Sequence, residues 1–287
     1  MSDQTSGRAA RLRPVALRVL LYVLLVLAVA PLVFPFLWMA SSALKPPAEI
    51  FSYPPRLIPQ HVAWENIGEV FRLQPFARQI WNSVYIAAAV TALTCALSLL
   101  SGYAFARLRF PGRNLLFFLL LSALMLPAEV TLIPLFKMLR LANLVDTHVP
   151  LIILPVFGAT GVMATFLIRQ FFQSLPPEVE EAAQLDGLGR LGIIWHIAMP
   201  LARPMLGAVA IIAFLASWNS YLEPLVFLNR VELFTVPVAI TAYTDATGHP
   251  LWNVQMAATA ISTLPVLLAY VLARRQITDS LAHANSR

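Results

Sequence analysis

Charged residues are scarce in this sequence. Asp, Glu, Lys and Arg make up only 12% of the 287 residues, whereas 59% of the residues are hydrophobic. A soluble domain carries roughly 25% charged residues, so this chain lacks the charge to cover a water-facing surface. The shortage excludes a soluble enzyme and a disordered protein, and it favours an all-α integral membrane protein.

Residues that carry common chemistry are also scarce. The single cysteine, Cys95, excludes an intrachain disulfide and a cysteine-based metal site. Lys45 and Lys137 are the only lysines, and Pro46 and Met138 follow them, so no Gly-x-x-x-x-Gly-Lys-Ser/Thr phosphate-binding loop occurs. The histidines form no His-Glu-x-x-His zinc pair, and no Gly-x-Ser-x-Gly elbow is present. We therefore expect no catalytic, metal-binding or cofactor-binding residues, and no nucleic-acid partner.

Six stretches with few or no charges are long enough to cross a membrane. An α-helix rises ~1.5 Å per residue, so about 20 residues cross ~30 Å of hydrocarbon. We expect helical spans at about residues 18–42, 79–106, 114–136, 149–170, 204–228 and 250–273. They would form one transmembrane domain over 18–275, with an N-terminal tail over 1–17 and a C-terminal tail over 276–287.

The first span has an alternative interpretation as a cleaved signal peptide. Four arginines precede it, and the small residues at 41–43 would pass as a cleavage site. However, the uncharged run over 19–44 is about twice as long as the 7–15 residues typical of a signal peptide. We interpret it as a retained helix.

The distribution of basic residues predicts the orientation. With a cytoplasmic N-terminus, 13 of the 20 Lys and Arg residues fall in inner segments and 7 in outer ones. This excess predicts that both termini are cytoplasmic. Two longer segments are then outside: a Pro-rich and aromatic one over 45–78, and one over 229–249 with Asp245, Gly248 and His249. Either could contact an external partner or lie at the membrane interface.

The inner loop over 173–203, between the fourth and fifth spans, contains the clearest pattern. Pro176 and Pro177 suit the first turn of a helix. Three glutamates follow and complement the positive end of the helix dipole. Gly187 and the glycines after it allow the helix to end in a sharp turn. The same run of charges is also typical of a solvated surface helix.

This loop resembles the EAA loop of ABC importer permeases. The matching residues are Glu181, Ala182, Ala183, Asp186, Gly187, Ile197 and Pro200. Asn82-Ser83, the run from Tyr103 to Arg107, and Trp218-Asn219 are similar to the carbohydrate-uptake branch, in particular to the maltose-type shorter permease. Leu188-Gly189 stands where that family usually has Ala-Ser, and the C-terminal tail lacks its usual Gly-Ala-Val-Lys-Gly ending.

The resemblance implies a type I ABC importer permease fold and a transport subunit rather than an enzyme. The matching loop residues would dock on a cytoplasmic ATPase as a coupling helix. The implied partners are a second homologous permease in a heterodimer, two ATPase subunits that bind ATP and Mg²⁺, and an extracytoplasmic solute-binding protein that delivers a sugar-like cargo. The implied location is the lipid bilayer of a bacterial-type plasma (inner) membrane.

Two carboxylates lie inside expected spans, where a charged side chain costs ~2.5–3.5 kcal/mol on insertion scales. Glu129 is in the third span, and Glu223 is near the outer end of the fifth, close to Asn219. Our hypothesis is that these three residues line the substrate pathway. Alternatively, Glu223 simply reaches the outer interface beside Pro224.

A second class of function uses the same acids differently. An ion-driven secondary transporter of a small polar solute would use Glu129 and Glu223 as proton or cation sites. Such a protein transports alone under an ion gradient, whereas an ABC permease needs its partners and ATP.

Overall fold

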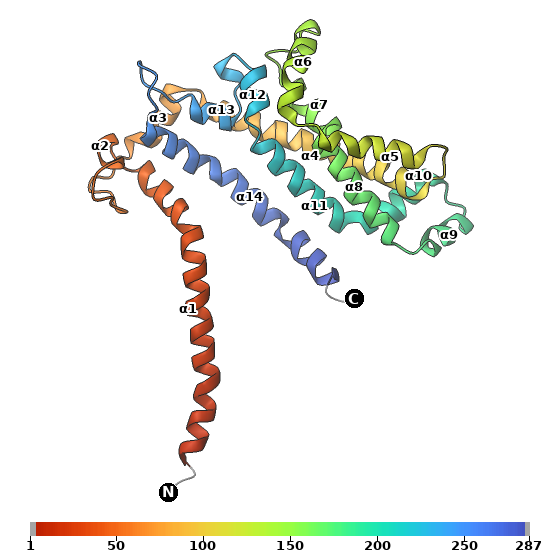
Figure 1. Cartoon of the computed structure of the whole chain (residues 1–287), viewed down its shortest axis with the longest axis horizontal. Helices are drawn as coiled ribbons and strands as arrows, with labels where there is room; N and C mark the ends of the chain where they lie inside the picture. The colour runs from red at the N-terminus through yellow and green to blue at the C-terminus, as the bar shows by residue number, and fades with distance from the viewer. Residues whose placement is uncertain (1–3, 285–287) are drawn as a thin grey trace. The chain divides into compact units, whose positions relative to one another are not determined.

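The computed structural model describes residues 4–284, with side-chain surroundings for residue 18, 20–127 and 129–271 (Figure 1). Helices make up this part of the chain, and no β-strand occurs within it. The chain divides into two compact units: residues 1–70 with 245–261, and residues 71–244 with 262–287. Helix α14 (Trp252–Ala284) begins in the first unit and continues into the second.

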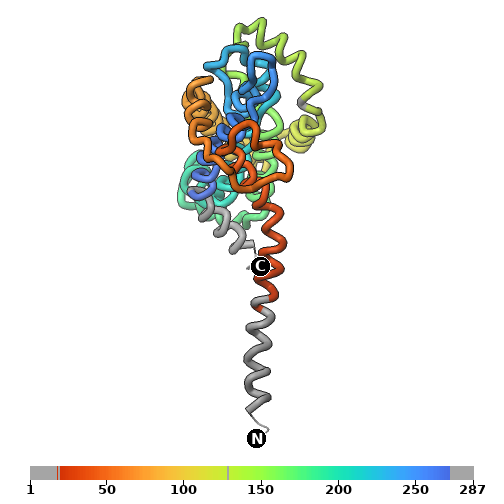
Figure 2. Tube along the Cα trace, turned by 90° about the vertical axis from the view of Figure 1, so that its left-hand side faces the viewer, coloured from red at the N-terminus to blue at the C-terminus, as the bar shows by residue number. Residues whose placement is uncertain are grey.

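The first unit is built on the long helix α1 (Gln4–Ala43), followed by α2 (Pro47–Ile50) and α3 (Glu65–Leu73). The segment after α1 folds over the end of that helix (Figure 2), and the buried Lys45 ammonium donates to the Arg56 carbonyl at 2.6 Å. Asn66 holds this turn, because its side-chain amide donates to the carbonyls of Ala43 and Lys45 at 3.0 and 2.9 Å. Asn253 of α14 in turn donates to Asn66 at 2.7 Å.

The second unit contains the remaining helices. Their bounds are α4 (Phe76–Arg107), α5 (Arg113–Ser122), η1 (Ala123–Met125), α6 (Ala128–Leu141), α7 (Val149–Phe157), α8 (Ala159–Ser174), α9 (Glu178–Leu185), α10 (Arg190–Ile193), η2 (Ile194–Ala198), α11 (Met199–Trp218), α12 (Leu222–Phe227), η3 (Val231–Leu233) and α13 (Val236–Thr241). Helices α4, α8 and α11 pack against one another as its centre (Figure 1). Helix α9 follows α8 at one end of this layer, and α13 contacts α4 at the other.

The central helices approach each other closely at Gly102. A Cβ atom there would lie 2.6 Å from Ile168 Cγ2 of α8 and 3.0 Å from the Arg169 backbone nitrogen. Two apolar clusters flank this contact. One includes Leu99, Ile168, Phe172, Ala183 and Ile193, and the other includes Ile86, Val90, Leu151 and Phe227. Helix α9 therefore belongs to the same packed core as the ends of α4 and α8.

Within the described residues, five helices are long and apolar enough to cross a membrane, or six if one bent pair forms a single span. The five are Leu20–Ala43, Phe76–Arg107, Val149–Ser174, Arg190–Trp218 and Trp252–Val271. The bent pair, Arg113–Met125 with Glu129–Leu141, corrects the expectation of one continuous helix over 114–136 because its halves meet at 101°. The break falls at Pro127, which has no N–H to continue the helical hydrogen bonds and restricts the residue before it.

The expectation of a helix over 204–228 is corrected in the same way. The helix begins at Arg190, passes through a π-turn at 194–198, and ends at Trp218. Helix α12 then starts separately at Leu222. Pro224 lacks the N–H that would bond to the Ser220 carbonyl in a continuous helix. The Ser220 hydroxyl donates to the Glu223 carboxylate at 2.7 Å at the start of α12.

Candidate functional site

The helix predicted in the loop over 173–203 is α9, and its ends form for local reasons. Its N-cap is Pro177, and three acids occupy its first turn. At its other end Gly187 adopts a φ of +86°, which favours glycine. The Gly187 N–H donates to the Gln184 carbonyl at 3.0 Å, and the Leu188 N–H to the Ala183 carbonyl at 3.1 Å. This pair of bonds is a Schellman motif, which satisfies carbonyls at the helix end.

Helix α9 has two different faces. Ala183 is 4% exposed and packs in the core beside Tyr103 and Phe172. On the opposite side Leu185 is 89% exposed. Among the residues of the EAA pattern, Glu181, Ala182, Asp186 and Gly187 are exposed, whereas Ala183, Ile197 and Pro200 are buried or half-buried. The pattern therefore divides into an exposed set on α9 and its C-terminal turn, and a set that packs this segment onto the core.

A polar cluster joins the N-terminal turn of α9 to the last turn of α4. Arg107 Nε lies 2.8 Å from Glu180 Oε1, and both side chains are 15% exposed. The Tyr103 hydroxyl, one helical turn before Arg107, donates to the other Glu180 oxygen at 3.1 Å. Arg107 Nη2 also donates to the carbonyl of Leu175, the C-cap of α8, at 2.9 Å. One guanidinium thus links α4, α8 and α9.

The sequence interpretation missed Glu180 in this role. It treated the three glutamates alike and used Arg107 only for orientation and for the resemblance. The residue pair is separated by 73 positions, so no local spacing indicates that the two side chains meet. The only available signal was that Tyr103 and Arg107, four residues apart on a helix, share one face.

The three residues predicted for the substrate pathway are not gathered in one place. Glu223 is half-buried and lines a cavity of about 390 Å³ together with Ser220, Thr131, Thr160 and apolar side chains of α6, α7 and α11. Asn219 is exposed at the C-cap of α11 and is not among the lining residues. Glu129 is exposed in the first turn of α6, also away from that lining.

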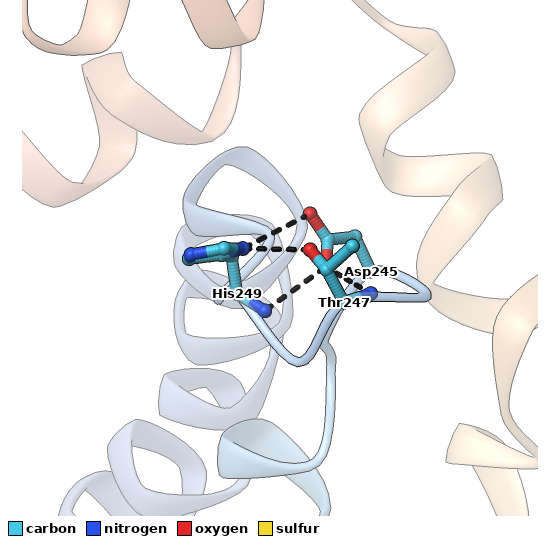
Figure 3. Close-up of polar contacts among 3 residues, drawn as sticks. All are labelled: Asp245, Thr247 and His249. Atoms are coloured by element: carbon cyan, nitrogen blue, oxygen red, sulfur yellow. Dashed lines mark hydrogen bonds and ion pairs between the residues drawn. The ribbon is translucent and has the colours of Figure 1, made fainter.

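Asp245 and His249, which were predicted to lie outside the membrane, form one tight turn with Thr247 (Figure 3). Asp245 Oδ1 accepts the N–H groups of Thr247 and His249 at 2.8 and 2.9 Å, and the Thr247 hydroxyl at 2.6 Å. The hydrogen bond from the Thr247 hydroxyl, followed by the backbone donors, lowers the pKa of the Asp245 carboxyl. Gly248, at φ +86°, allows this turn. These contacts are local and stabilise the turn itself.

Two other residues of the resemblance have a packing role. The Asn82 amide donates to the carbonyls of Glu232 and Phe234 at 2.9 and 3.1 Å, and the Ser83 hydroxyl accepts the Val236 N–H at 2.8 Å. They fix η3 and α13 to the first turns of α4. Among the side chains that the structure describes, no group of three or more His, Cys, Asp or Glu is placed to hold a metal ion.

The described part of the chain is thus helical, with five or six apolar helices long enough to cross a membrane, an exposed short helix in one loop, and a cavity lined by apolar side chains and a few polar ones. Residues 96–282 match the family described as binding-protein-dependent transport system inner membrane component. The chain belongs to this family, and it is an ABC importer permease subunit and a multi-pass membrane protein.

Several permeases are similar to this chain over most of their length. The sn-glycerol-3-phosphate transport system permease protein UgpE of Yersinia enterocolitica is 34% identical over 91% of this chain and 94% of its own. The inner membrane ABC transporter permease protein YcjP of Escherichia coli K12 is 34% identical over 86% and 89%. The diacetylchitobiose uptake system permease protein NgcG of Streptomyces coelicolor is 31% identical over 93% and 88%.

The fold has solved counterparts. A crystal structure of a bacterial ABC transporter involved in the import of the acidic polysaccharide alginate matches with a TM-score of 0.75 at 21% identity, over 93% of this chain and 97% of that one. A second alginate transporter structure, in complex with an alginate pentasaccharide-bound periplasmic protein, matches with a TM-score of 0.57 at 15% identity, over 96% and 97%. At these identities the likeness concerns the fold.

Proposed function

We propose that this chain imports a sugar or sugar-like solute, delivered by an extracytoplasmic binding protein, in a complex driven by ATP. Its partners in this proposal are a second homologous permease and two ATPase subunits, which bind the ATP and Mg²⁺. The names of the relatives support the cargo class, because they include permeases for a phosphorylated polyol and for a disaccharide.

The exposed face of α9 carries the proposal of ATPase docking. Leu185 is 89% exposed and lies near Glu181 and Asp186 on the part of α9 that the core does not cover, so this face is open to a partner. An apolar residue with acids beside it suits insertion into a cleft of a partner protein. Ala182 is small and exposed, so a partner surface can approach the α9 backbone closely. Glu181, Ala182, Asp186 and Gly187 would form this contact, with Ile197 and Pro200 supporting it from below.

We further propose that both termini are cytoplasmic. The excess of 13 basic residues over 7 supports this orientation. With that orientation α9 lies on the cytoplasmic side, where ATPase subunits are found, and the turn at Asp245 lies outside, where a binding protein arrives.

The cavity beside Glu223 is our candidate for part of the cargo path. It offers a carboxylate and the hydroxyls of Ser220, Thr131 and Thr160 among apolar side chains. Hydroxyl groups and carboxylates hydrogen-bond sugar hydroxyls, while apolar walls cover the faces of the sugar ring. Asn219 is the C-cap of α11 and directly precedes Ser220, and Glu129 lies in the first turn of α6, which also carries Thr131. Both therefore stay in the proposal as neighbours of the path.

Substitution of Gly187 tests the docking role. In the reconstituted importer, Gly187→Leu should leave ATP hydrolysis measurable but lower ATP-dependent uptake about tenfold. This effect corresponds to a loss of ~1.4 kcal/mol in the free energy of the contact between α9 and the ATPase. A Cβ at Gly187 meets nothing within 4 Å in this chain, so the first added carbon brings left-handed backbone strain but no clash within the chain.

Two matched controls isolate that effect. Gly112 has a similar φ of +76° and equally open space, and Gly189, in the same loop, is open but has a φ of −71°. Gly112→Leu reproduces the backbone strain of about 1–2 kcal/mol, and Gly189→Leu reproduces the added bulk. Normal coupled uptake by Gly187→Leu, or an equal loss in Gly112→Leu, would count against the docking role.

A further inference from the structure

The contact between Glu180 and Arg107 differs from an ordinary surface ion pair. Exposed pairs contribute little, because water screens them and the side chains lose freedom. Here both side chains are only 15% exposed, and both carboxylate oxygens are engaged, one by Arg107 and the other by Tyr103. A pair this buried cannot lose one partner without leaving the other charge uncompensated. The contact therefore fixes the position of α9 more firmly than the apolar packing of Ala183 alone.

The arrangement also separates two roles among neighbouring acids. Glu181 is exposed, whereas Glu180 is 15% exposed and its two carboxylate oxygens contact Arg107 and Tyr103 within the chain. A partner protein on the exposed face would meet Glu181 and Leu185 but not Glu180. Glu180 therefore acts through its contacts within the permease.

Helix α4 extends from this contact to the other end of the second unit. Its 32 residues correspond to about 48 Å at ~1.5 Å per residue. Near its first turns, Gln79, Asn82 and Ser83 bind the backbone of η3 and α13. One continuous helix therefore connects the Arg107 contact to segments at the other end of α4.

We propose that Glu180, Arg107 and Tyr103 form a joint that makes α9 and α4 move together, so that motion of the docked ATPase reaches the far end of α4. Glu180 is a positioning residue in this proposal and does not itself contact the ATPase. The proposal rests on the proposed function, because it needs α9 to be the docking element.

The test uses the complete importer in lipid nanodiscs and compares Glu180→Gln with Glu178→Gln. Glu178 is an exposed acid in the same helical turn, so it is the matched control. Two spin labels, at Gln184→Cys and Arg109→Cys in a Cys95→Ser background, report the spread of distances between α9 and the end of α4. The second readout is the stimulation of ATP hydrolysis by the binding protein, purified with its bound ligand.

If the joint exists, Glu180→Gln should widen the distance distribution between the spin labels and lower the stimulation of ATP hydrolysis at least fivefold. Glu178→Gln should change neither. Arg107→Gln should act similarly, and the double variant should lose no more than either single one, because the substitutions remove one shared interaction. The proposal is overturned if Glu180→Gln behaves like Glu178→Gln, or if the losses of stimulation in Glu180→Gln and Arg107→Gln multiply in the double variant. It is also overturned if stimulation falls while the distance distribution between the spin labels stays narrow, because that result assigns Glu180 to the ATPase contact.

A cross-link separates this proposal from the one on which it rests. Leu185→Cys in the parent complex should cross-link to an ATPase subunit. Failure of that cross-link would contradict the docking role of α9, and with it the transmission from the ATPase. A cross-link in the parent combined with a silent Glu180→Gln variant would contradict the joint alone.

Discussion

At the scale of single residues, the polar contacts of the second unit fall into two kinds. Asn82 and Ser83 bind backbone groups and hold segments in place. Glu223 accepts a hydrogen bond from its neighbour Ser220 and still lines a cavity with polar partners beside it. Since a carboxylate has room for about four hydrogen bonds, Glu223 keeps acceptor capacity for a bound solute.

This difference gives a prediction for the cargo path. The double variant Asn219→Ala/Glu223→Ala should lower uptake by the assembled importer about tenfold, because a hydrogen bond contributes roughly 0.5–1.5 kcal/mol and one to a charged group more. Uptake of the ligand carried by the binding protein is the measurement. Glu232→Ala, which removes an exposed acid from η3, is the control. Unchanged uptake by the double variant in an intact complex would exclude these residues from the path.

At the scale of helices, α4 and α8 depend on a small residue at their contact. Gly102→Ala should lower the midpoint of thermal unfolding of the complex by about 2–12 °C, because overpacking costs about 1–3 kcal/mol and each kcal/mol shifts the midpoint of a large chain by roughly 2–4 °C. The Cβ would meet a branched side chain and a backbone atom, neither of which yields easily.

Gly68→Ala is the comparison for that experiment. Gly68 lies inside α3, is exposed, and has nothing within 4 Å of a Cβ position. Alanine there should stabilise the helix or leave the midpoint unchanged, since Ala is favoured over Gly in a helix by about 1 kcal/mol. Equal midpoints for the Gly102 variant and the parent would show that the two helices are not tightly packed.

The helices also show which features a sequence can predict. Helix α9 was predictable because local residues decide it: prolines before it, acids in its first turn and Gly187 after it. The breaks at Pro127 and after Trp218 were not, because a scarcity of charge indicates apolar length and not backbone direction. The pairing of Glu180 with Arg107 needed the packing of α4 on α8, which no single segment encodes.

At the scale of the whole chain, much apolar surface remains for other molecules to cover. Of the five long apolar helices in the described residues, Leu20–Ala43 has no buried residue in its most apolar window. In the other four, 22–39% of the residues in that window are buried. A lipid bilayer supplies an apolar environment that makes such exposure stable. The few acids are placed differently from one another: Glu181 and Asp186 are exposed at α9, Glu180 is paired within the chain, and Glu223 lines a cavity.

The central claim is that this chain transports only as part of an ATP-driven complex. Reconstitution into liposomes tests it directly, with uptake measured for the isotopically labelled ligand that co-purifies with the binding protein. We predict uptake when the second permease, the ATPase subunits, the loaded binding protein and ATP are all present, and none by this chain alone under a proton or sodium gradient. Ion-driven uptake by the chain alone would contradict the account and would identify an ion-coupled transporter instead.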